Sequence, residues 1–213
     1  MAVSLKKGQG VSLRKSENDL STVTIGLGWD VQETKKGLLG TLFSKKEEEY
    51  DLDVVAFLCD AAGKVRNLGQ AVDGRRTLVG GDIVFFNSLR HNSGAIWLTG
   101  DNLTGAGDGD DEQIVARLND LPSGYDKIVF VVQIYAGAKK EQSFGKVNNA
   151  YIRAVDAKNK EMVRFEITGG SAQSTYRSMV FAELVREASG WKFHAIGEYS
   201  PSDSFVDALK KYL

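Results

Sequence analysis

The 213-residue chain is poor in the residues on which disulfides, zinc sites and membrane spans depend. Cys59 is the only cysteine, so no intrachain disulfide can form, and its apolar neighbours predict a small buried hydrophobe. His91 and His194 are the only histidines, too few for a zinc site without further cysteines. The apolar runs reach about five or six residues, against the roughly 20 that a membrane-spanning helix needs. These absences exclude direct insertion into a membrane through a helix.

An excess of charge of either sign is also missing. The chain has 27 Lys and Arg against 28 Asp and Glu, a formal net charge of −1, so we expect no nucleic-acid partner. The first seven residues, Met1–Lys7, lack the apolar core of a signal peptide. We therefore expect a soluble cytoplasmic protein with a reduced thiol.

Only two prolines but 23 glycines are present, and the glycines separate short β-branched and aromatic runs. This pattern predicts a mainly β fold, either a sandwich or a barrel, and no shift in composition divides residues 1–213 into two domains. Val3–Lys7 and Val11–Lys15 are near copies around Gly8–Gly10, which predicts an opening hairpin. Ile128–Val132 is apolar throughout and is expected to be a central strand covered on both faces. The other predicted strands are 22–28, 52–59, 83–87, 95–98, 113–118, 149–155, 162–168, 179–186 and 191–197.

The end of the chain has a helical pattern. In Ser202–Leu213 the apolar residues Phe205, Leu209 and Tyr212 fall on one helical stripe, which predicts a short C-terminal helix docked on the sheet. Two further segments, 35–49 and 67–81, look like loop insertions. The first could dock a partner through its leucines or fold back onto the body of the protein.

The segment Thr99–Glu112 carries the strongest functional signal. It holds five carboxylates in a glycine-rich stretch, and no Lys or Arg lies between Arg90 and Arg117. Carboxylates held this close repel one another, so the folded protein needs a cation there or an open, hydrated loop. Hard oxygen ligands favour Ca²⁺, although no EF-hand string is present. A phosphate-binding glycine loop is excluded, since it needs a Lys or a helix N-terminus rather than acids.

One loop rarely supplies the six to eight oxygens that calcium takes, so other segments must contribute. Asp51 and Asp53 begin a predicted strand and point to the same face, because strand side chains alternate. Asp30 follows a glycine-containing strand whose glycines allow a close approach, and Asn87 offers an amide oxygen at a strand end. Each alone could be a cap or turn residue, but beside the acidic loop each becomes a candidate ligand.

Several segments together resemble the TerD family of tellurium-resistance and stress proteins, in the family's order and over nearly the whole chain. The segments that carry the resemblance are Gly26–Asp30, Tyr50–Asp53, Val84–Asn87, Thr99–Gly105, Gly107–Glu112 and Gln142–Gly145, with Val3–Gly8, Met179–Leu184 and Trp191–Phe193 in support.

The resemblance implies a β-sandwich of two packed sheets that binds Ca²⁺, with two neighbouring ions, through acidic loops at one end. It does not extend to Asp111, because adjacent carboxylates seldom face the same ion. The ligands that it implies are Asp30, Asp51, Asp53, Asn87, Asp101, Asn102, Asp108, Asp110 and Glu112.

Three functions stay open at this point. The first is a calcium-dependent binding or scaffold module of the stress response, with a protein partner drawn from related family members or a membrane-associated complex. The second is a divalent-metal-dependent hydrolase of phosphate-containing ligands, which the number of acids argues against because Mg²⁺ prefers few carboxylates. The third is a structural domain in which the metal only stabilises the fold.

Overall fold

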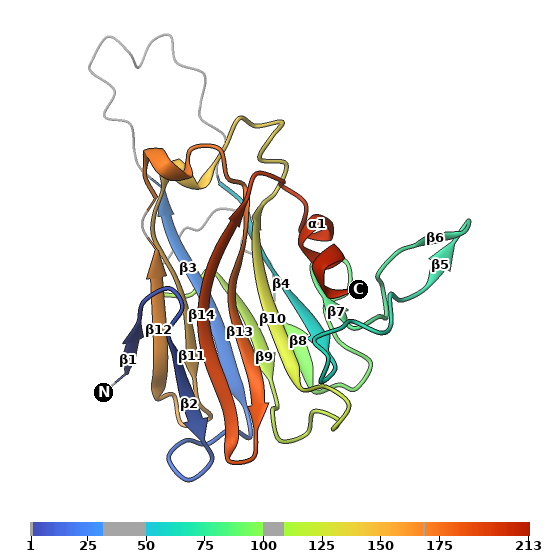
Figure 1. The fold of residues 1–213 in the computed structure, drawn as a ribbon, viewed down its shortest axis with the longest axis vertical. Coiled ribbons are helices and arrows are strands. Elements are labelled where there is room, and N and C mark those ends of the chain that lie inside the picture. The colour runs from blue at the N-terminus through green and yellow to red at the C-terminus, as the bar shows by residue number, and fades with distance from the viewer. Residues whose placement is uncertain (1, 32–49, 100–108, 168) are drawn as a thin grey trace.

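Two six-stranded sheets pack face to face in the computed structural model, which describes residues 2–31, 50–99, 109–167 and 169–213 (Figure 1). The predicted mainly β fold is therefore confirmed as a sandwich. The first sheet has the spatial order β1 (Val3–Leu5), β12 (Glu161–Ile167), β11 (Val147–Val155), β3 (Val23–Val31), β9 (Glu112–Ala116) and β8 (Ile96–Leu98). The second has the order β2 (Gly10–Arg14), β14 (Gly190–Ser200), β13 (Ser178–Glu187), β10 (Lys127–Ile134), β4 (Leu52–Cys59) and β7 (Ile83–Val84).

Strands β4 and β10 are buried on both faces, as the apolar run Ile128–Val132 predicts. Because strand side chains alternate, Val54 and Phe130 join the core between the sheets, whereas Val55 and Val129 join a second apolar cluster on the outer face. Cys59 belongs to this outer cluster, and its burial raises the pKa of the thiol to about 12. The thiol is thus an inert buried group, as predicted.

A short helix covers that outer face. The α-helix α1 (Phe205–Leu209) continues as a 3₁₀ turn over Lys210–Tyr212, and Ser204 Oγ caps it by accepting from Val206 N at 3.3 Å. The predicted apolar stripe is confirmed, although the helix begins at Phe205 because Ser204 is the capping residue. Two further 3₁₀ turns span Phe144–Lys146 and Ser171–Gln173. None of the helices in the described ranges is both long and apolar enough to cross a membrane.

Two predicted strand arrangements are wrong. Val3–Leu5 and Gly10–Arg14 do not form a hairpin, because β1 pairs in parallel with β12 while β2 pairs with β14 in the other sheet. Each strand gains more by completing the edge of a large sheet than by pairing with its near copy. The strand predicted over 83–87 ends at Val84, because Phe85 and Ser88 bond to each other around a two-residue turn at Phe86–Asn87.

The insertion at 67–81 contains a small hairpin, β5 (Ala71–Val72) and β6 (Arg75–Arg76), that projects from the sandwich (Figure 1). Its turn residues Asp73 and Gly74 have φ values of 48° and 74°, as a tight hairpin turn requires. The other predicted insertion, 35–49, lies outside the described residues.

Leu209→Ala should destabilise the protein by about 2–4 kcal/mol, because it leaves a cavity between α1 and the outer face of β4 and β10. Leu209 is only 2% exposed. Val206→Ala on the same helix is the matched control, and its 41% exposed side chain predicts a change within about 0.5 kcal/mol. Denaturant unfolding would measure both, and equal losses would show that the helix does not contribute through packing.

Candidate metal centre

Oxygen-bearing side chains from several strands meet at the end of the sandwich where β3 ends and β4 and β9 begin. The β3–β9 pairing reaches Leu27 and Glu112, and Asp111 N extends it by donating to Leu27 O at 2.7 Å. The carboxylate of Asp111 then accepts from Trp29 N at 3.0 Å. This turn of the chain places Asp110 and Asp111 against the end of β3.

Asp53 and Glu112 are predicted ligands that the structure buries, with 5% and 2% of their surface exposed. Glu112 reaches from the first sheet to the second, where its Oε2 accepts from Val54 N. Asp53 accepts on Oδ2 from Gln133 Nε2 at 2.8 Å. Glu112 therefore bonds to the residue that directly follows Asp53 on β4. Buried carboxylates need donors or a positive charge, because desolvation disfavours their ionised form.

Asp30 lies at the exposed end of β3, with a partner from β11. Asn149 Nδ2 donates to Asp30 Oδ2 at 2.8 Å. A bulge between Asn148 and Tyr151 breaks the register with β3, and Asn149 itself has a φ of 49°. Such bulges redirect side chains, and asparagine tolerates this backbone conformation better than most residues do. The bulge thus aims the Asn149 amide at the predicted ligand.

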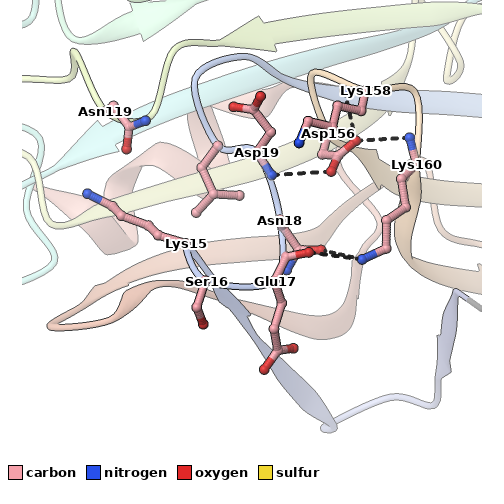
Figure 2. A pocket seen from close by; sticks show the side chains of 10 residues that line it. Lys15, Ser16, Glu17, Asn18, Asp19, Asn119, Asp156, Lys158 and Lys160 are labelled. Carbon is pink, nitrogen blue, oxygen red and sulfur yellow. Dashed lines mark hydrogen bonds between the residues drawn. The ribbon is translucent and has the colours of Figure 1, made fainter.

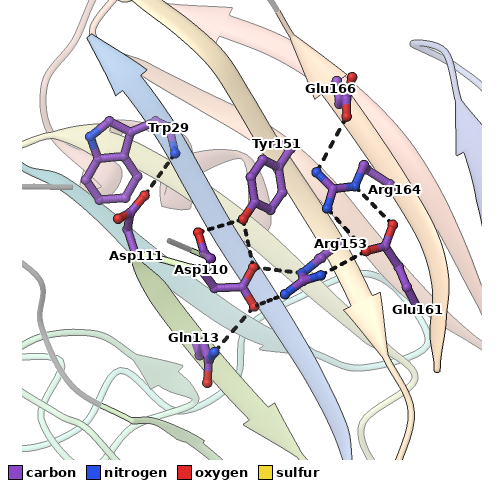
Figure 3. A network of polar contacts seen from close by, with 10 residues as sticks. Trp29, Asp110, Asp111, Gln113, Tyr151, Arg153, Glu161, Arg164 and Glu166 are labelled. Atoms are coloured by element: carbon purple, nitrogen blue, oxygen red, sulfur yellow. Dashed lines mark hydrogen bonds and ion pairs between the residues drawn. The ribbon is translucent and has the colours of Figure 1, made fainter. Parts of the chain in front are cut away.

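The counter-charge of the Asp110 carboxylate is a side chain of the protein itself. The guanidinium of Arg153, on β11, contacts both carboxylate oxygens, with Nε at 2.8 Å and Nη2 at 3.2 Å (Figure 3). The hydroxyl of Tyr151 lies 3.1 Å from Asp110 Oδ1, and the side chain of Asp110 is only 2% exposed. The absence of Lys and Arg between Arg90 and Arg117 therefore does not leave Asp110 without a counter-charge. Its counter-charge comes from Arg153, 43 residues further along the chain.

Residues of β11 and β12 in the first sheet extend this contact into a row of alternating charges. Glu161 accepts from Arg153 Nη1 at 2.9 Å and from Arg164 Nε at 3.0 Å, and hydrogen bonds from Arg164 and then Arg153 lower its pKa despite desolvation. Arg164 lies over the ring of Tyr151 at 4.1 Å. Burial, followed by the nearby charge of Asp110, raises the pKa of Tyr151 to about 12, so its hydroxyl keeps its proton.

Two glycines of β3 make room for this network. A Cβ on Gly26 would lie 2.0 Å from Asp110 Oδ2, and a Cβ on Gly28 would lie 2.5 Å from the ring of Tyr151. No side chain could occupy either position without displacing the residue above it. The close approach expected at Gly26 and Gly28 is thus an approach to a carboxylate and an aromatic ring.

A pocket of about 360 Å³ lies beside the network. Its charged lining is acidic, with Asp30, Asp111 and Glu166 facing a single guanidinium, that of Arg164. Desolvation is the main cause of a raised pKa at Asp111, and the charges of Asp30 and Asp110 add to it while the hydrogen bond from Trp29 opposes it. Carboxylates are therefore crowded at this end of the sandwich, and a bound cation would relieve that crowding.

The remaining predicted ligands differ in how the structure places them. Asp51 lies at the same end, and its carbonyl accepts from Tyr135 N at 2.8 Å. Asn87 is exposed in the turn after β7, next to Phe86, whose ring packs 6.2 Å from that of Tyr135. The structure thus brings Asp30, Asp51, Asp53, Asn87 and Glu112 to one end. Three predicted ligands lie outside the described residues: Asp101, Asn102 and Asp108.

The donors at this end suit a hard cation, because they are carboxylates and amides without thiol or imidazole. Within residues 2–31, 50–99, 109–167 and 169–213, however, no three acidic, histidine or cysteine side chains are close enough together to hold a metal ion. A complete coordination sphere at this end would therefore need oxygens beyond those of the described acids. Any calcium held there would be bound by Asp53, Glu112 and their neighbours together with further oxygens.

A second pocket, of about 350 Å³, lies at the opposite end of the sandwich (Figure 2). One of the carboxylates that line it, that of Asp156, accepts from the backbone N of Lys158 and of Lys160, each at 2.9 Å, and of Asp19 at 3.2 Å. Desolvation acts to raise the pKa of Asp156, but these donors outweigh it and leave the pKa below its ordinary value. This carboxylate fastens two loops together and is already saturated by donors, so it is a poor metal ligand.

Four residues of the site were not singled out from the sequence: Gln133, Asn149, Tyr151 and Arg153. Tyr151 and Arg153 alternate along a predicted strand, so a shared face could have been predicted for them. Their partners could not, because contact with Asp110 depends on β11 and β9 both flanking β3.

The family profile described as the TerD domain matches residues 1–212. The tellurium resistance protein TerX of Serratia marcescens is 69% identical over 213 residues, with 100% of both chains covered. The stress response protein SCP2 of Bacillus subtilis (strain 168) is 36% identical over 214 residues, again with 100% of both chains covered. A solved structure, a homologue of the telluride resistance protein TerD from Streptomyces coelicolor A3(2), shares the fold with a TM-score of 0.60. Its sequence identity is 21%, and the match covers 91% of this chain and 98% of that one.

Arg153→Met should cost about 2–3 kcal/mol of stability, because it leaves the buried carboxylate of Asp110 without its counter-charge. The side chain of Arg153 is 26% exposed, so solvent screens the ion pair and keeps the loss of stability from being larger. Adding Asp110→Asn to this variant removes the stranded charge and should restore about 1 kcal/mol. Denaturant unfolding of the two single variants and the double variant would test this, and strictly additive losses would contradict the pairing.

Gly26→Ala should destabilise the protein by about 1–3 kcal/mol, because the added methyl group displaces Asp110 from Arg153. Gly124→Ala is the matched control, since a Cβ there meets nothing within 4 Å and the φ of Gly124 is not positive. Thermal unfolding of both variants would compare them. A tolerated alanine at position 26 would show that the carboxylate does not need to lie flat on β3.

Proposed function

Since this chain belongs to the TerD domain family of tellurium-resistance and stress-response proteins, we propose that it is a cytoplasmic calcium-dependent binding or scaffold module. Calcium would hold the loops at one end of the sandwich in a fixed arrangement, and that arrangement would form the surface for a protein partner. The alternative, a divalent-metal-dependent hydrolase of phosphate-containing ligands, would use the same acids, but their number favours it less because Mg²⁺ prefers few carboxylates.

The observation that carries the proposal is the burial of two carboxylates at the start of β4: that of Asp53, which belongs to this strand, and that of Glu112, which reaches Val54 N from β9. Asp30 and Asp111 add two further carboxylates at the end of β3. Carboxylates gathered from three strands at one end of the sandwich repel one another, and a bound cation would relieve that repulsion. Oxygen ligands in this number favour Ca²⁺ over Mg²⁺, which keeps most of its water.

We assign the proposed ligands to two neighbouring ions and give Asp110 a different role. Arg153 holds both oxygens of Asp110, which supports a function as the anchor that keeps the chain before Glu112 on β3. The proposed ligands are Asp30, Asp51, Asp53, Asn87, Asp101, Asn102, Asp108 and Glu112.

The proposed response to calcium follows from linkage. A ligand that binds only the folded protein stabilises it by about 2.7 kcal/mol at a hundred times its Kd. Without the ion the carboxylates repel and the end of the sandwich opens, and with it they pack. The surface available to a partner would therefore depend on the calcium concentration.

Calcium at saturating concentration should raise the melting temperature of the wild-type chain by about 5–10 °C relative to chelator. Asp53→Asn combined with Glu112→Gln should remove most of that rise. Asp120→Asn is the control, because Asp120 is an exposed acid in a weak pair with Arg117, 3.5 Å away and outside the proposed ligand set. Differential scanning calorimetry with calcium, magnesium and chelator would measure all three proteins.

Identical wild-type melting curves with calcium and with chelator would contradict the proposal. Turnover of phosphoesters that disappears in the Asp53→Asn variant would instead favour the metal-dependent hydrolase.

A further inference from the structure

Gln133 joins the proposed calcium site to the C-terminal helix. It lies directly across from Asp53 in the β10–β4 pairing, and it is 4% exposed. Its Nε2 donates to Asp53 Oδ2 at 2.8 Å, and its Oε1 accepts from Phe205 N, the first residue of α1, at 2.7 Å. One buried amide therefore holds a proposed ligand on one side and a helix end on the other.

The orientation of this amide is fixed by its two partners. A carboxylate can only accept, and a backbone N–H can only donate, so the amide nitrogen must face Asp53 and the oxygen must face Phe205. While α1 is docked, both partners hold the amide in this orientation. Loss of the contact with Phe205 would free the amide to rotate, and the direction in which the Asp53 carboxylate faces would no longer be set.

A second path runs from α1 to the Asn87 turn. The ring of Phe205 packs 5.3 Å from that of Phe85, and Phe85 packs 5.4 Å from Phe86. Phe86 immediately precedes Asn87 in the two-residue turn, and its ring contacts Tyr135, whose backbone N donates to Asp51 O. The docked helix is thus linked, through these intervening residues, to three proposed ligands, Asp51, Asp53 and Asn87.

We infer that Gln133 is a positioning residue for the proposed calcium site and that, through it, docking of α1 sets the affinity for the cation. The inference rests on the proposed function. Groups that orient metal ligands typically contribute about 10- to 100-fold to metal affinity. Linkage is reciprocal, so calcium must also hold α1 more firmly on the sheet, and undocking of α1 must weaken calcium binding by the same factor.

The test combines calcium titration by calorimetry with hydrogen exchange of the C-terminal peptide, using the full chain. Gln133→Met keeps the side-chain length but removes both hydrogen bonds, and it should raise the calcium Kd about 10- to 100-fold. In the wild type, calcium should slow exchange in residues 205–213, and in Gln133→Met this protection should be lost. Exchange at these residues should also be faster in the Gln133→Met variant without any metal.

Two further variants separate positioning from a general loss of stability. Ser204→Ala removes the helix cap without touching Gln133 or Asp53, and it should speed exchange in α1 and raise the Kd about fivefold or more. Tyr125→Phe is the matched control. It removes a hydrogen bond of 2.8 Å to Asp82 near the opposite end of β4, and it should leave the Kd within about twofold.

The outcomes distinguish the inference from the proposed function. A wild-type chain that gives no heat with calcium would overturn both. A wild type that binds calcium, with an unchanged Kd in Gln133→Met, would overturn the inference alone. If Gln133→Met does not fold, Ser204→Ala decides: faster exchange in α1 with an unchanged Kd would refute the coupling.

Discussion

Desolvation of carboxylates is the constraint on which this end of the sandwich depends. Asp53, Asp110 and Glu112 are almost inaccessible to solvent, and an ionised carboxylate in that position needs a donor or a positive charge. The structure answers the requirement differently at each one. Asp110 has the guanidinium of Arg153, Asp53 has the amide of Gln133, and Glu112 has the backbone N of Val54. The strands are held together at this end because each carboxylate is fastened to a different strand.

This distribution of partners also separates two kinds of acid. A guanidinium contacts both oxygens of Asp110, whereas the donors described for Asp53 and Glu112 are an uncharged amide and a backbone N–H. The glycines of β3 belong to the same arrangement, because the Asp110–Arg153 pair can lie flat on the sheet only where no Cβ is present.

The sequence was sufficient to predict the fold class, but it was insufficient to predict which side chains contact the acidic residues. The unbroken apolar run Ile128–Val132 predicted β10 as a central strand, and the apolar stripe that includes Phe205 predicted α1, because both patterns are local. The opening hairpin was wrong because pairing of near copies is also a local argument, and the sheets offered β1 and β2 better partners. Strand order likewise decides that Arg153 meets Asp110, and no spacing in the sequence encodes that order.

Because β4 is buried on both faces, Asp53 is linked to the rest of the molecule. A strand with one solvated face could carry Asp53 without involving the rest of the molecule. Here the outward face of β4 is covered by α1, so the carboxylate is buried under the helix and must be satisfied from β10. The side-chain amide of Gln133 donates to this carboxylate, and its oxygen accepts from the backbone N of Phe205 in α1. The contact that holds α1 on the sheet therefore also orients a proposed ligand. The C-terminal helix belongs to the proposed site in this sense, although none of its side chains is a proposed ligand.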